Sequence, residues 1–276
     1  DRWPKSNAIV EDGRRAPVPD KAQPEGAVVF SHADKRRGHL TLQWAVFLPT
    51  EEGRYRYEAH IPDSSREYSV TLHGQFFVDA GRRGIDGMEL LAEPAADESR
   101  QTTEASVHLA WNQALAQHLA LPAVLPGLAN YVEVAALSDL QVTALTDALV
   151  RCATAGDSDA KITFVQAYLR HLCSQHSWVR TLRADGARWE LTSADAKFLL
   201  LPRPVGNDNS RPWRAVPGLL SLGDFTFIDS QAPRICLPPS FWDETLVESA
   251  LNRIPSETLV SEVELRYLVE FLSMHK

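Results

Sequence analysis

Cysteine is scarce in this chain. The 276 residues contain three cysteines, and no two of them form a C-x-x-C pair: Cys152, Cys173 and Cys236. An odd number of cysteines without that spacing does not build a disulfide framework and is typical of reduced thiols. We therefore expect a cytoplasmic protein.

Long apolar runs are missing as well. The longest uncharged apolar stretch, residues 119–132, is interrupted by Pro122, Pro126 and Gly127, whereas a membrane-spanning helix needs about 20 consecutive apolar residues. We expect no membrane partner. No basic segment followed by an apolar one forms a secretion signal. Because residue 1 is Asp rather than Met, we expect the chain to be a fragment of a longer protein.

Common catalytic signatures are absent too. The sequence has no G-x-S-x-G, no H-E-x-x-H and no G-x-x-x-x-G-K-[S/T] pattern. His171, Cys173 and His176 are close in sequence, but at helical spacing their side chains diverge, so they do not predict a metal site. We expect no cofactor, no metal and no complete active site in this chain.

The chain also has no excess of positive charge, because its formal net charge is −8. Such a balance does not predict a general affinity for nucleic acid. Local basic clusters do occur, at Arg14-Arg15, at residues 35–37 and at Arg82-Arg83. They leave a local anion site open on an acidic protein.

The patterns that are present predict an α+β fold. Alternating apolar and polar residues predict strands at 26–32, 40–49, 55–60 and 68–78, and their short spacing favours an antiparallel sheet. Apolar residues at helical spacing predict helices at 105–119, 125–136, 140–153 and 162–178. Beyond these we expect strands at 198–201, 225–228 and 234–237, and helices at 243–252 and 261–275.

This succession predicts three parts. Residues 1–25 carry four prolines and many charges, and we expect an extended arm or linker. Residues 26–136 are expected to form a mostly antiparallel sheet with covering helices. Residues 137–276 are expected to form a more helical α+β domain.

One segment organises the chain: residues 68–86, YSVTLHGQFFVDAGRRGID. It begins as a strand and then places His73, several glycines and the pair Arg82-Arg83 close together. In the helix that follows, we interpret Trp111 as a core anchor and Asn112 as a cap or loop clamp. Further on, Ser138 and Asp139 can cap the helix at 140–153.

Three blocks of the chain resemble sacsin and its bacterial relatives. They are FLP followed by YSVTLHGQFFVDAGRRGID, then WNQALAQHLALPAVLPGLANYV from Trp111, then WELTSADAKFLLLP with ICLPPSFWDETLVESAL. The likeness covers most of residues 26–275. In such proteins this region follows an ATP-binding domain of the GHKL type, similar to that of the ninety-kilodalton heat-shock chaperones. The resemblance implies a transducer-like middle region of a chaperone-type protein, with ATP and magnesium bound upstream and other proteins as partners.

The resemblance also implies a role for the arginine pair. In GHKL enzymes the domain after the ATPase supplies a basic residue that reaches the γ-phosphate, so Arg82 or Arg83 is the candidate catalytic residue. A guanidinium offers a rigid, permanently charged fork for phosphate oxygens. The alternative is a solvated turn with salt bridges to Asp79 or Asp86. Both arginines remain candidates.

Cofactor binding has three secondary candidates. Residues 79–84 read D-x-G-x-x-G, which superficially resembles a nucleotide-binding glycine box, so Gly81 and Gly84 are considered. That box needs an upstream Glu/Asn helix and a second glycine-rich lid, and neither precedes it here, so the pattern alone is weak. His73 is considered because it ends a strand, although such a position more often holds a hydrogen-bonded histidine of the core or of a strand edge.

Two other functions stay open. The chain could be a protein–protein interaction or scaffold module without ATPase coupling. It could also belong to a bacterial anti-phage defence protein that senses nucleic acid through the basic turns.

Overall fold

The computed structural model describes the central part of the chain most fully. The described residues are 10–11, 14–15, 24–35, 37–46, 56–62, 64–78, 84–86, 104–154, 176–183, 186–193, 196, 198–201 and 226–235, together with residues 252, 262, 266 and 269. Near the start, two short strands pair with each other, β1 (Val10–Glu11) and β2 (Arg14–Arg15). The fold as a whole is α+β, as the sequence predicts.

The first large sheet contains the four strands predicted from alternation. They are β3 (Gly26–Asp34), β4 (Gly38–Ala45), β5 (Arg56–Ile61) and β6 (Arg66–Gly74). Their order in the sheet is β3-β6-β4-β5. The sheet is mostly antiparallel, as expected, since two of its strand pairs are antiparallel; the exception is the pair of β4 and β6, which is parallel.

Burial explains this order. Strands β4 and β6 occupy the centre, where Leu40, Leu42, Val70 and Leu72 are at most 1% exposed. Strands β3 and β5 lie at the edges, and most residues of β3 are exposed. A strand in the centre of the sheet is paired along both of its edges, and its inward-facing side chains are covered by the neighbouring strands and helices.

Helices follow the first sheet at the predicted positions. They are α1 (Glu104–Leu115), a π-helical turn η3 (Ala116–Ala120), α2 (Val124–Val134) and α3 (Asp139–Thr154). The start of α3 confirms the predicted cap: the Gln141 backbone N–H donates to Ser138 Oγ at 3.4 Å, and the Ser138 backbone N–H donates to Gln141 Oε1 at 2.9 Å. This reciprocal pair is a capping box.

The second sheet was predicted only in part. Its strands are β7 (His176–Arg183), β8 (Gly186–Ser193), β9 (Phe198–Leu201) and β10 (Thr226–Asp229), in the order β8-β7-β10-β9. The predicted strands at 198–201 and 225–228 are confirmed within one residue. Of the predicted strand at 234–237, Ile235 forms an isolated bridge with Trp178, and residues 236–237 lie outside the described residues.

The hairpin of β7 and β8 corrects the sequence analysis. Residues 176–178, the end of the predicted helix 162–178, belong to a strand, and residues 162–175 lie outside the described residues. The described part of 137–276 is consequently less helical than expected. Strand pairing overrides the local helical spacing, because Trp178 and Val179 are both buried, one against the helices and the other in a separate cluster of the second sheet.

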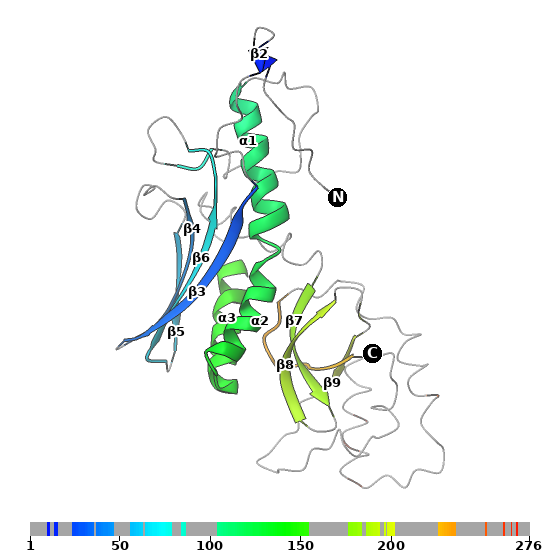
Figure 1. Cartoon of the computed structure of the whole chain (residues 1–276). Helices are drawn as coiled ribbons and strands as arrows, with labels where there is room; N and C mark the ends of the chain where they lie inside the picture. The colour runs from blue at the N-terminus through cyan, green and yellow to red at the C-terminus, as the bar shows by residue number, and fades with distance from the viewer. Residues whose placement is uncertain are drawn as a thin grey trace.

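Helices α2 and α3 lie between the two large sheets, and α1 extends past them (Figure 1). One apolar cluster joins these layers: it includes Leu40 and Val70 of the first sheet, Leu145 of α3 and Trp178 of β7. This core therefore includes residues from both sides of the predicted boundary at 136–137, and the division into domains stays a prediction. Among the described residues, no helix is long and apolar enough to cross a membrane.

Candidate functional site

The candidate site lies where the organising segment leaves the first sheet. Beyond β6, Val78 and Ile85 form an antiparallel bridge. Next to it, the Asp86 backbone N–H donates to the Phe77 carbonyl at 3.1 Å. We call Phe77, Val78, Ile85 and Asp86, with Asn112 of α1, the loop neck. Residues 79–83 connect its two sides and lie outside the described residues.

Asn112 holds the two sides of the loop neck together. Its Oδ1 accepts the Phe77 backbone N–H at 2.7 Å, and its Nδ2 donates to the Phe77 carbonyl at 2.7 Å and to the Asp86 carbonyl at 2.9 Å. The residue is 0% exposed. Its acceptor and both of its donor hydrogens are thus engaged, as a buried amide requires. This confirms the interpretation of Asn112 as a loop clamp; it is not a cap, because α1 begins eight residues earlier, at Glu104.

Aromatic contacts fix the loop neck to α1 as well. The ring of Phe77 stacks on His108 with centroids 4.0 Å apart and an interplanar angle of 11°. The indole of Trp111 meets Phe77 edge-on at 6.5 Å. Ile85 is 1% exposed and belongs to the apolar core. The base of the segment is therefore held by packing and by hydrogen bonds from one helix.

The structure separates the predicted site residues. Gly84 is buried and adjoins Ile85 in the loop neck. His73 lies half-buried on β6, opposite Ala27 of β3 and Ala45 of β4. The other predicted site residues lie outside the described residues: Gly81, Arg82 and Arg83. The structure adds one feature to the prediction: the loop neck anchors the chain on both sides of these residues.

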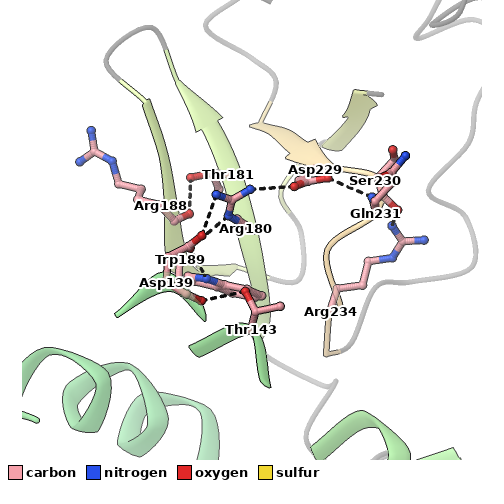
Figure 2. Close-up of polar contacts among 10 residues, drawn as sticks. All are labelled: Asp139, Thr143, Arg180, Thr181, Arg188, Trp189, Asp229, Ser230, Gln231 and Arg234. Atoms are coloured by element: carbon pink, nitrogen blue, oxygen red, sulfur yellow. Dashed lines mark hydrogen bonds and ion pairs between the residues drawn. The ribbon is translucent and has the colours of Figure 1, made fainter. Parts of the chain in front are cut away.

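Sequence reasoning missed a second polar cluster, centred on Arg180 of β7. Its guanidinium donates to Asp139 through Nε at 3.2 Å and Nη2 at 2.9 Å, and to Asp229 through Nη1 at 2.8 Å. Trp189 Nε1 also donates to Asp139, at 3.0 Å. Figure 2 shows Arg180 between the two carboxylates, which come from α3 and β10. We call Asp139, Arg180, Trp189 and Asp229 the Arg180 network.

The Arg180 network is built to hold elements together. Asp229 is 3% exposed, and its second oxygen accepts the Gln231 backbone N–H at 3.0 Å. Burial lowers the pKa of the neighbouring Arg234, and the Asp229 carboxylate opposes that shift. Because one guanidinium bridges both carboxylates, the network links α3 to β7, β8 and β10, and the nearby Arg234 offsets the one negative charge that remains. Its members are distant in sequence, so no local pattern could have identified them.

We also considered thiols and metal-binding groups among the described residues. Burial raises the pKa of the Cys152 thiol to about 12, which leaves almost no thiolate at neutral pH. Among the described residues, no three or more His, Cys, Asp or Glu side chains are grouped to hold a metal ion. Of the two clusters, only the loop neck adjoins residues that the sequence marks as functional.

Comparison with known proteins adds no assignment. No protein-family model, no curated protein and no solved structure matches this chain.

Proposed function

We propose that this chain is the non-catalytic middle region of a large, sacsin-like, GHKL-ATPase-coupled protein of chaperone type. In this proposal an upstream domain binds ATP and magnesium, and Arg82 or Arg83 relays or completes its active site. Residues 26–136 are the transducer-like part, and residues 137–276 support it. The observation that carries the proposal is the loop neck, which anchors both ends of the segment that contains the two arginines.

An anchored base is what such a role needs. A guanidinium that stabilises the transferring phosphoryl group acts only when it is held in position. Asn112 fixes the backbone at Phe77 and Asp86 through three hydrogen bonds of 2.7–2.9 Å. The backbone at the two ends of the segment is thereby held against α1, so this part of the chain would lose less conformational entropy when a partner domain docks.

Single substitutions in the intact protein test this proposal. Arg82→Ala and Arg83→Ala are compared with Arg37→Ala, which removes an exposed arginine from the other basic turn. We expect one of the first two to leave ATP affinity nearly unchanged and to lower turnover, by up to about 10³-fold if it stabilises the transition state. Melting temperatures are expected to stay close to wild type, because substitutions of charged residues outside a protein core usually change stability by less than about 0.5 kcal/mol. Wild-type turnover in both variants, or unfolding of both, contradicts the proposal.

A specific observation also favours the second candidate function, a protein-interaction module without ATPase coupling. Among the described strands, β3 has one edge that pairs with no other strand, and exposed strand edges recruit further strands. The two functions differ in a simple measurement. ATPase coupling predicts that the arginine variants change turnover, whereas a pure interaction module predicts that they do not.

A further inference from the structure

Strand β3 is an edge strand of the first sheet, and within the described part of the chain one side of its backbone pairs with no strand. It pairs with β6 over its full nine residues, and no strand among the described residues lies on its other side. Natural edge strands are usually protected by lysine, proline or a bulge. Residues 26–34, GAVVFSHAD, contain neither lysine nor proline, their register with β6 is unbroken, and Val29 is 53% exposed.

The register shows which backbone groups point outward. At the two ends of the strand pair, Gln75 N–H donates to the Glu25 carbonyl at 3.3 Å and Lys35 N–H donates to the Ser65 carbonyl at 2.7 Å. In an antiparallel pair, alternate residues exchange hydrogen bonds with the partner, and the residues between them point away. The odd-numbered residues of β3 therefore bond to β6. The N–H and C=O groups of the even-numbered residues, such as Val28, Phe30 and His32, face the open edge.

The open edge is complementary to itself. If two copies of β3 pair antiparallel about a twofold axis at Phe30, all nine residues overlap. Residues whose backbone N–H and C=O groups face the open edge then lie opposite each other and can exchange hydrogen bonds. The same register places Glu25 of each copy directly opposite Lys35 of the other, so opposite charges meet at both ends. Lys35 is 61% exposed and also pairs with Glu67 of its own chain at 2.7 Å. Glu25 is exposed and accepts from Gln75 Nε2 at 2.7 Å. Between them, the face turned away from the helices carries only small or β-branched side chains: Ala27, Val29, Ser31 and Ala33.

We propose that this chain forms a twofold dimer through β3. The first sheet of one copy and the first sheet of the other then form one continuous sheet of eight strands. The occupant of the edge is a second copy because the full-overlap register and the charge-matched register coincide. Directly opposed ion pairs and aromatic pairs across strands each stabilise such pairing. The proposal does not depend on the proposed function, since no residue of the loop neck belongs to β3.

The first test is the oligomeric state of the purified chain and of one proline variant. Sedimentation velocity across micromolar concentrations should show a monomer–dimer equilibrium. Val28→Pro removes an N–H that faces the open edge and not β6, so it should abolish the dimer and keep the fold, because proline is tolerated at the solvent side of edge strands. Val29→Pro removes an N–H that bonds to β6, and should lower the melting temperature markedly.

Charge reversal tests the register without introducing proline. Glu25→Lys alone and Lys35→Glu alone each turn both end pairs into like-charge pairs, and should weaken the dimer about tenfold at low salt. The double variant restores opposite charges and should return the dissociation constant close to wild type. A chain that is monomeric at all concentrations, a dimer that survives Val28→Pro, or single reversals without effect would overturn the proposal.

Discussion

Replacing Asn112 with alanine should loosen the loop neck and leave the remaining fold in place. The substitution removes three hydrogen bonds, at 2.7, 2.7 and 2.9 Å, from a side chain that is 0% exposed. Each such bond contributes about 1 kcal/mol net, and backbone groups left unpaired add to the loss. We therefore expect the free energy of unfolding to fall by about 3 kcal/mol, against a typical total of about 5–15 kcal/mol.

Urea denaturation measures this loss, and hydrogen exchange locates it. The amide of Phe77 should lose its protection in Asn112→Ala, because its acceptor is gone. The matched control is Asn130→Ala, which truncates an exposed asparagine of α2 and should change stability by less than about 0.5 kcal/mol. If Asn112→Ala is as stable as Asn130→Ala, or if Phe77 keeps its protection, the loop neck is not held as described.

Three further predictions concern other parts of the fold. Arg180→Met removes the ion pair of the buried Asp229 and should lower the free energy of unfolding by about 3 kcal/mol. Arg183→Met on the same strand breaks a more exposed pair and should lower it by less than about 1 kcal/mol. Equal urea midpoints of the two variants would contradict this. Gly38→Ala places a Cβ 2.6 Å from a backbone carbonyl oxygen and should destabilise by about 1–3 kcal/mol, so an unchanged midpoint refutes the packing. Burial raises the pKa of Cys152 from 9.0 to about 12, so its contribution to stability is complete below about pH 9 and is lost as the pH rises toward 12, by up to about 4 kcal/mol. Cys152→Ala should flatten that part of the pH profile, and an unchanged slope would be the contrary result.

Local patterns were sufficient for most of the elements. Alternation in residues 68–78 predicted β6, and helical spacing after the expected cap at Ser138-Asp139 predicted α3. The parallel pairing of β4 with β6 could not be predicted, because it depends on which strands compete for the centre of the sheet. The hairpin of β7 and β8 was missed for a different reason. Its turn signal, Asp185-Gly186, was present but was outweighed by helical spacing upstream.

The candidate site could likewise be predicted only in part. Asn112 was predicted as a cap or a loop clamp, and its hydrogen bonds to Phe77 and Asp86 identify it as the clamp. Its partners, Phe77 and Asp86, are 35 and 26 residues away and became visible only in the fold. The Arg180 network joins residues 41 and 49 positions apart, and pairings over such distances leave no trace in the local sequence.

The most direct test of the central claim is the rate of ATP hydrolysis at saturating ATP by the intact protein that carries Arg82→Ala and Arg83→Ala together. The double variant removes compensation of one arginine by the other. The account predicts ATP affinity and a melting temperature close to wild type, with turnover lowered by up to about 10³-fold. Turnover equal to wild type in the folded double variant would contradict the claim that this segment completes an upstream active site.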